Sequence, residues 1–231
     1  MASRETQNKI LDKAITLFNA EGSGRISCNR IAEECRISKG NLHYHFKQKE
    51  EIILAIWGRI SQEIETQWGE DAPQPTITHM AEITQRQFNL MWRYRFFYRE
   101  LTTLLDGDSL LKHRFIQIRR KREASIRRFF IALVEHNVLV LPDEDDALES
   151  LLRIAWIVTE HWMSSIAIED KVIDATTMQE GYRLTLQLFM PLLSEDARKD
   201  VPESFRVFKV DLEGSRASAV ESLCTKATPH I

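Results

Sequence analysis

Polar and aromatic side chains are crowded into one short segment near the N-terminus, SKGNLHYHF, at residues 38–46. Four side chains in or just after this segment have the chemistry for contacts to phosphate oxygens: Ser38, Lys39, Tyr44 and Lys49. Asn41 and His43 can reach base edges near a helix start, and Gly40 permits close approach to a sugar-phosphate backbone. These residue types favour a surface that contacts a nucleic acid.

Other roles for this segment fit its composition less well. A buried core segment would carry more aliphatic side chains than Leu42 and Phe46, and a solvated helix face without a partner would not expose this much aromatic surface. His43 and His45 could be taken as a metal pair, but residues two apart on a helix point about 200° away from each other. The sequence therefore predicts neither a metal site nor a cofactor.

Three short helices are expected to position the segment. Apolar residues recur at helical spacing over 10–18 and predict a first helix that ends at Gly22. Ser27 is expected to cap a second helix and Ser38 a third. The inward side chains of these two helices are expected to be Ile31, Ala32, Cys35, Leu42 and Phe46. Two capped helices joined by a short turn form a helix-turn-helix, which seats its second helix in the DNA major groove.

Longer helical patterns fill the rest of the chain, and nothing indicates a strand, so the predicted fold class is all-α. The expected helices cover about residues 49–68, 78–98, 109–139, 145–168 and 177–193. The Gly- and Pro-containing stretch 69–75 predicts a loop, and Asp143, which follows Pro142, is expected to cap the next helix. We place a boundary near residue 50, between an N-terminal domain of residues 1–50 and a helical body of residues 51–195. A partly disordered tail is expected over 196–231.

Composition limits the class of protein. The 231 residues are 43% apolar and 28% charged, which is typical of a folded chain. Three cysteines lack metal-ligand spacing, and neither a signal segment nor a long apolar run appears, so we expect a cytoplasmic protein that is not associated with a membrane. Residues 1–59 hold ten Lys and Arg against seven Asp and Glu, whereas the remainder holds 21 against 27. A basic N-terminal region therefore precedes an acidic body.

DNA binding by residues 38–46 has three alternatives. The basic run IRRKREASIRR at residues 118–128 is a rival nucleic-acid surface, but basic residues on the outer side of a long helix are usually just solvated. Pairing with the acidic residues at 143–149 or with a partner subunit is a further interpretation. A helical adaptor that binds only protein remains open. An enzyme is not expected, because no phosphate loop, nucleophile elbow or HExxH motif is present.

The first 57 or so residues resemble the TetR family of transcriptional regulators. ILDKAITLFNAEG is similar to the first helix of that family, ISCNRIAEECRIS to its second helix and turn, and KGNLHYHFKQKEEIILAIW to its recognition helix and fourth helix. The resemblance places these residues near DNA: Cys28, Asn29, Lys39, Asn41, His43, Tyr44, His45 and Lys49. Arg36 stands where the family usually has glycine, so the turn is either differently shaped or strained by about 1 kcal/mol or more.

For the body, the resemblance implies a helical domain that binds a small molecule and dimerises. The expected function is that of a repressor that binds a palindromic operator as a homodimer and is released by a small-molecule effector. An activator of the same fold is the alternative. The dimer surface is expected on the helices at 145–168 and 177–193, which are apolar on more than one side. The helix at 49–68 is expected to transmit ligand binding to the DNA-binding domain.

Aromatic residues interspersed with polar groups at 91–101 and 154–166 predict where a ligand pocket lies, since cavities between helices are apolar with a few polar groups. The candidate ligand-binding residues are Phe88, Trp92, Arg95, Phe96, Phe130, Trp156, His161 and Trp162.

Overall fold

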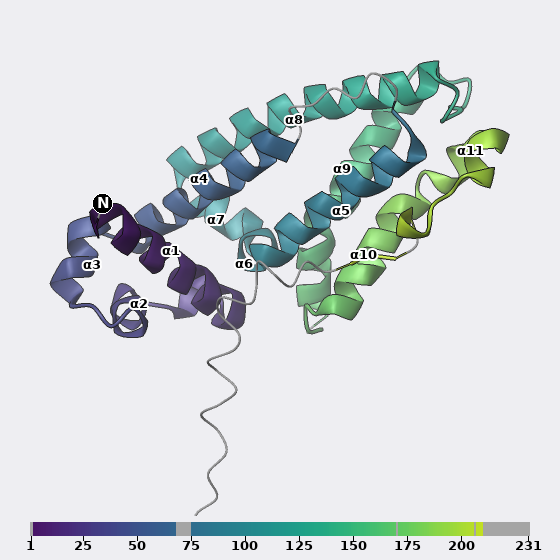
Figure 1. Ribbon diagram of the computed structural model, residues 1–231. Helices are drawn as coiled ribbons and strands as arrows, with labels where there is room; N and C mark the ends of the chain where they lie inside the picture. The colour runs from purple at the N-terminus through teal and green to yellow at the C-terminus, as the bar shows by residue number, and fades with distance from the viewer. Residues whose placement is uncertain (1, 68–74, 170, 206, 210–231) are drawn as a thin grey trace, which may run out of the picture. The chain divides into compact units, whose positions relative to one another are not determined.

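The computed structural model describes residues 2–67, 75–169, 171–205 and 207–209, which belong to two compact units divided after Arg59. The elements in chain order are α1 (Ala2–Glu21), η1 (Ser23–Arg25), α2 (Cys28–Glu34), α3 (Lys39–His45), α4 (Lys49–Gln67), α5 (Ile77–Arg93), α6 (Arg95–Arg99), α7 (Leu101–Gly107), α8 (Ser109–Glu135), α9 (Ala147–Ile168), α10 (Ala175–Gln187), η2 (Met190–Leu192), α11 (Glu195–Lys199) and η3 (Glu203–Phe205) (Figure 1). Over these ranges the only β-pairing is an isolated bridge between Leu139 and Leu193. The predicted all-α class is confirmed. In the same part of the chain, no helix is both long enough and apolar enough to cross a bilayer.

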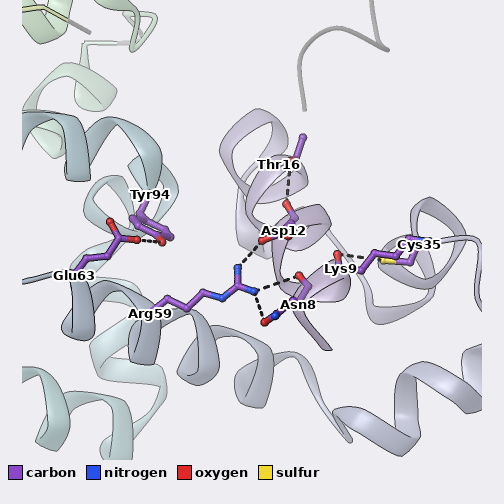
Figure 2. Close-up of polar contacts among 8 residues, drawn as sticks. All are labelled: Asn8, Lys9, Asp12, Thr16, Cys35, Arg59, Glu63 and Tyr94. Carbon is purple, nitrogen blue, oxygen red and sulfur yellow. Dashed lines mark hydrogen bonds and ion pairs between the residues drawn. The ribbon is translucent and has the colours of Figure 1, made fainter. Parts of the chain in front are cut away.

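The first unit packs α1, α2, α3 and the first turns of α4 around one apolar core. Its most deeply buried side chains include Ile10, Ala14, Phe18, Ile31, Leu42, Ile52 and Ile56. Arg59 holds α4 against α1, because its guanidinium donates to Asp12 Oδ1 at 2.5 Å and to Asn8 Oδ1 at 2.9 Å (Figure 2). Cys35 Sγ lies 3.9 Å from the carbonyl oxygen of Lys9, which places the end of α2 beside α1.

The turn between α2 and α3 keeps the left-handed shape despite its arginine. Arg36 has φ 53°, and its N–H donates to the carbonyl of Glu33 at 3.0 Å. The N–H of Ile37 donates to the carbonyl of Ala32, also at 3.0 Å, so both hydrogen bonds of a Schellman helix end are present. Of the two alternatives for this turn, the structure supports a strained arginine in the usual geometry rather than a different turn.

Helix α4 runs from Lys49 to Gln67, in agreement with the helix expected over 49–68, and carries an apolar stripe. All six members of the stripe that lie in the described chain are buried: Ile52, Ile53, Ile56, Trp57, Ile60 and Ile64. The expected end of this helix at Trp68, and most of the predicted loop at 69–75, lie outside the described residues.

The second unit, Ile60–Lys209, is built on α5, α9 and α10, with α10 packed against both α5 and α9 (Figure 1). Helix α6 also packs against α9, and α7 packs against α8. The fully buried side chains of this unit include Phe88, Met91, Phe96, Phe97, Leu133, Met163, Tyr182 and Leu186. This core is rich in aromatic rings, as the sequence of residues 91–101 indicates.

Several helix boundaries in this unit differ from the predictions. The helix expected over 78–98 is divided at Tyr94, where φ is −112° and ψ 37°, and the buried phenol of Tyr94 donates to Glu63 Oε1 at 2.6 Å (Figure 2). Helix α8 ends at Glu135 rather than 139, because Asn137 at φ 54° closes it with a left-handed turn. The prediction that Asp143 caps the next helix is wrong, since α9 begins at Ala147.

The C-terminal part of the described chain packs onto the second unit. Phe205 and Phe208 are buried, and the ring of Phe208 contacts those of Phe88 and Tyr182 with centroids 5.9 and 5.5 Å apart. The N–H of Lys209 donates to Gln85 Oε1 on α5 at 3.2 Å. The disorder predicted farther along falls on residues 210–231, which lie outside the described chain.

Candidate nucleic-acid interface and buried cavity

Helix α3 presents most of its length to solvent and uses two apolar side chains to hold itself in place. Leu42 and Phe46 are 1% and 7% exposed and face the core, as predicted. Tyr44 is 80% exposed, and its ring meets that of His45 edge to face at 5.2 Å. The other exposed members of the helix are Lys39, Gly40, Asn41 and His43, whereas His45 is half-buried. The predicted outward residues of α3 therefore share one short exposed segment.

The start of α3 is fixed by Ser38, whose Oγ accepts from the N–H of Asn41 at 3.1 Å. Ser27 caps α2 in the same way by accepting from the N–H of Arg30 at 3.2 Å. Both predicted caps are confirmed. Because caps satisfy the N–H groups that open a helix, they set which residues lie in the first turn. Asn41 is thereby held in the first turn of α3.

The hydrogen bond made by His43 defines what its imidazole offers outward. Nδ1 lies 3.2 Å from the carbonyl oxygen of Lys47, which can only accept, so Nδ1 carries the proton. In the neutral ring Nε2 is then an acceptor, suited to an amino group on a base edge.

At the start of α2, Asn29 is exposed and Cys28 is half-buried. Burial raises the pKa of the Cys28 thiol, the carboxylate of Glu50 raises it further, and Lys49 acts in the opposite direction. The thiol is therefore held in its neutral form. Lys49, predicted to contact the DNA backbone, donates from Nζ to the carbonyl oxygen of Ser23 at 2.7 Å. Lys49 therefore also holds the beginning of α4 to η1.

The second unit contains a cavity of about 100 Å³ lined mainly by apolar side chains of α5, α8 and α9, together with Thr185 of α10 and Phe189 after it. Five polar or amphipathic side chains in its lining form what we call the polar wall: Gln87, Tyr98, Arg122, Trp156 and Glu160. They come from four helices, α5, α6, α8 and α9. An apolar cavity with a few convergent polar groups is the usual form of a small-molecule site.

The polar wall is linked by hydrogen bonds and stacking. Arg122 Nη2 donates to Gln87 Oε1 at 2.8 Å, and its guanidinium lies over the indole of Trp156, 5.2 Å from the ring centroid. The indole N–H of Trp156 donates to Glu160 Oε2 at 2.7 Å. Arg119 pairs with that same oxygen at 3.0 Å. Glu160 is thus a buried carboxylate with two donors on one oxygen.

Burial governs the ionisation of two members of the polar wall. It raises the pKa of the Tyr98 phenol to about 12, while the charge of Arg122 and a hydrogen bond with Gln87 act in the opposite direction. Burial also lowers the pKa of the Arg122 guanidinium, which nevertheless stays charged because arginine does not deprotonate in proteins. Near neutral pH the wall presents a neutral phenol beside a cation.

The structure brings only two of the predicted ligand-binding residues to the cavity, Phe130 and Trp156. The other six lie outside its lining: Phe88, Trp92, Arg95, Phe96, His161 and Trp162. Phe88 and Phe96 are packed in the core, and Trp92 is covered by Arg95, whose guanidinium lies 4.6 Å from the ring centroid. The indole of Trp162 donates to the carbonyl of Thr177 at 2.9 Å, and His161 is exposed. The ligand-binding roles of all eight residues stay predictions.

The sequence analysis does not single out Gln87, Tyr98 or Glu160, although Tyr98 and Glu160 lie in the regions 91–101 and 154–166, and it includes Arg122 only in the basic run 118–128. One local signal could have identified Arg122 as a buried polar residue. It lies on the same helical face as the apolar residues Ile118, Ile126 and Phe130, and a charged residue in such a position is rarely buried without a partner. No local pattern reveals that side chains of separate helices meet. Their pairing becomes visible only in the folded unit.

Residues of the basic run at 118–128 form ion pairs inside the second unit. Arg127 pairs with Glu149 of the acidic stretch, which is one of the pairings the sequence left open, and Arg119 pairs with Glu160. A groove between α8 and α9, here called the arginine groove, adjoins the cavity and shares Trp156 with it. Its charged lining residues are Arg119, Arg120, Glu123, Arg127, Arg128, Glu149 and Arg153.

Comparison with known proteins covers both units. Residues 10–56 match the family described as "Bacterial regulatory proteins, tetR family", and residues 59–201 match the one described as "Bacterial transcriptional repressor". The probable HTH-type transcriptional regulator YttP of Bacillus subtilis (strain 168) is 26% identical over 168 residues, which are 68% of this chain and 79% of YttP. The HTH-type transcriptional regulator AcrR of Shigella flexneri is 29% identical over 85 residues, and the match spans only 39% of its length.

A solved structure agrees over most of both chains. The TetR-family transcriptional regulator from Marinobacter aquaeolei VT8 is 30% identical, with a TM-score of 0.75, and the match covers 84% of this chain and 94% of that one. These relatives are transcriptional regulators, a class distinct from enzymes. The family match beyond residue 59 spans more than half of the chain. The chain belongs to the TetR family of bacterial transcriptional regulators.

Proposed function

We propose that this chain is a repressor that binds a near-palindromic operator as a homodimer and leaves it when a small-molecule effector occupies the cavity. The observation that carries the proposal is the exposure of α3, which buries Leu42 but leaves Lys39, Asn41 and Tyr44 open to a partner. Regulators of the TetR family bind DNA and small-molecule ligands and are dimers, which supports the DNA, effector and dimer parts of the proposal. The part of the proposal that concerns the effector, here called the effector arm, rests on the polar wall of the cavity.

Within α3 the side chains divide into two roles. The amide of Asn41 can bond bidentately to an adenine in the major groove, and His43 Nε2 can accept from a base amino group. Lys39 and Tyr44 supply phosphate contacts, which position the helix without reading sequence. We therefore assign base reading to Asn41 and His43.

A DNA-binding experiment tests the regulator. Duplexes selected from a random pool should converge on an inverted repeat, with half-sites about 34 to 36 Å apart or at a multiple of that spacing. Asn41→Ala should relax the preference at one base pair per half-site, at a cost of about 1 to 3 kcal/mol. The matched control is Gln48→Ala, which removes an exposed amide outside α3. Failure to select any sequence would reject operator binding and favour a protein-binding adaptor.

The dimer proposal is supported by the outer face of α9. Ile154 and Ile157 are 48% and 54% exposed there, whereas the exposed positions of α10 include Glu180 and Arg183. This favours α9 over α10 as the larger apolar contributor. Ile154→Glu should convert a dimer into a monomer in light scattering at micromolar concentration. Leu110→Glu, at an equally exposed leucine of α8, should leave the dimer intact.

Regulatory polarity is tested in cells. A reporter joined to the selected operator should rise in expression when this gene is deleted, because a repressor has been removed. A fall in expression would instead identify an activator of the same fold. Neither outcome depends on the identity of the effector.

A further inference from the structure

The charge around the cavity is unbalanced, and the imbalance is positive. Together the cavity and the arginine groove are lined by six arginines and three glutamates, without lysine or aspartate. Among the residues that line the cavity itself, Arg122 is the cation and Glu160 the carboxylate. Glu160 also pairs with Arg119 from the groove, so two guanidinium groups act on one buried carboxylate.

The geometry of Glu160 argues against a cationic ligand. Its Oε2 already accepts from Trp156 at 2.7 Å and from Arg119 at 3.0 Å. A ligand cation would have to compete with Arg119 and would approach the charge of Arg122. In a site of low polarity, such like-charge contact is costly.

Arg122 is placed to meet an acid group. Its Nε is inaccessible to solvent, and its Nη2 is held at 2.8 Å by the amide of Gln87, which fixes the plane of the guanidinium. A fixed guanidinium loses little side-chain freedom when it binds a planar acid group. The neutral phenol of Tyr98 lines the same wall and can donate a further hydrogen bond.

The rest of the cavity lining determines which chemical groups the ligand can carry besides its acid group. Apart from the polar wall and a few threonines, the cavity is lined by aliphatic and phenylalanine side chains such as Ile126 and Phe129. Its volume of about 100 Å³ is smaller than the roughly 150 Å³ of an apolar cavity that holds benzene. The ligand body must therefore be compact, and a larger ring would have to extend into the adjoining arginine groove. The arginine groove shares Ile126, Leu152 and Trp156 with the cavity and would raise the local concentration of anions beside it.

We propose that the cavity binds a compact amphiphilic anion, an aromatic ring or short chain bearing a carboxylate or similar acid group, and that Arg122 with Gln87 receives the acid group. This deepens the proposed function, on which it rests, by naming the chemical class of the effector. The acid group would lie at the polar wall and the apolar body among the side chains of α5, α8 and α10.

The test is calorimetric titration of the full chain with matched probes that differ in charge. Benzoate, benzamide and benzamidinium share one ring, and the three 2-naphthyl analogues extend the series in size. The carboxylate should bind at least about tenfold more tightly than the amide, and the amidinium should bind most weakly. Equal affinities, tighter binding of the amidinium, or no binding by either carboxylate would overturn the proposal.

Two variants of opposite expected sign separate charge recognition from damage to the fold. Arg122→Gln should reduce the carboxylate-to-amide ratio to within about threefold of unity, whereas Glu160→Gln should increase carboxylate affinity because it removes negative charge. Arg114→Gln, an exposed arginine on α8 outside the cavity and the groove, should change neither. Loss of affinity in both cavity variants would contradict the charge argument.

Operator binding measured in parallel distinguishes this inference from the proposed function. If benzoate or 2-naphthoate binds with the expected preference but leaves the operator complex intact, the cavity assignment stands and the effector arm of the proposed function fails. If other compounds release the operator while the carboxylates do not bind, the proposed function stands and the anion assignment fails.

Discussion

The indole of Trp162 on α9 lies directly against Gly181 on α10, so that a Cβ at Gly181 would stand 2.4 Å from both Cδ1 and Nε1 of the ring. The same Nε1 donates to the carbonyl oxygen of Thr177 at 2.9 Å. The contact brings the backbone of α10 close to α9. It also explains why Trp162, predicted as a pocket residue, is absent from the cavity lining.

Gly181→Ala should lower the free energy of unfolding by about 1 to 3 kcal/mol, because an added methyl group has no space beside the indole. Urea denaturation followed by circular dichroism measures the change. Gly107→Ala is the matched control, since no heavy atom lies within 4 Å of its Cβ position. If the contact causes the loss, Trp162→Leu should restore stability in the Gly181→Ala background by relieving the overlap.

Two lysines of the first unit should differ in what each contributes to stability and to DNA binding when changed to alanine. Lys49→Ala removes a hydrogen bond to the Ser23 carbonyl and should lower the free energy of unfolding by about 1 kcal/mol. Lys39 is exposed, so Lys39→Ala should change the free energy of unfolding by no more than about 0.5 kcal/mol. It should reduce the slope of log K for DNA binding against log salt concentration by about one. Unchanged stability in Lys49→Ala would show that the contact with Ser23 contributes nothing.

The φ of 53° at Arg36 predicts an unusual stabilising substitution. Arg36→Gly should be more stable than Arg36→Ala by about 1 kcal/mol, because glycine adopts the left-handed conformation without a Cβ penalty. Both variants lose the same positive charge, so their difference reports the backbone alone. Chemical denaturation of the two proteins measures it, and equal midpoints would mean that the turn stores no strain.

The first unit follows from local sequence signals more completely than the second. Ser27 and Ser38 cap helices through hydrogen bonds to residues three positions along, and Leu42 and Phe46 lie on one helical face, so nearest neighbours carry the information. Even the departure at Arg36 was visible as a non-glycine residue in a turn. Such features need no knowledge of distant parts of the chain.

The second unit depends on which helices meet, and periodicity does not encode that. Arg122, Gln87 and Glu160 stand on three helices, and each alone resembles a polar residue at the edge of an apolar stripe. The boundary at α9 shows a related limit: several acidic residues precede it, and the helix begins at Ala147 rather than after Asp143. Tertiary packing can select among starts that are locally equivalent.

The last prediction concerns α4, which we propose as the element that couples ligand binding to DNA binding. Gly58 lies near the middle of this helix, and a Cβ at this position would meet no heavy atom within 4 Å. Gly58→Ala should therefore raise the free energy of unfolding by about 0.5 to 1 kcal/mol and keep the coupling. Gly58→Pro removes a helical N–H and should cost about 3 kcal/mol or more in this helix.

Coupling is reciprocal, so in the parent protein the operator should weaken effector affinity by the same factor by which effector weakens operator affinity, typically about 5- to 150-fold. Calorimetric titration of effector with and without operator measures one side of this cycle, and fluorescence anisotropy of labelled operator measures the other. In Gly58→Pro both factors should fall toward one together, provided that circular dichroism shows a folded protein. A folded proline variant that binds operator and releases it with the parental factor would show that an intact α4 is not required for transmission.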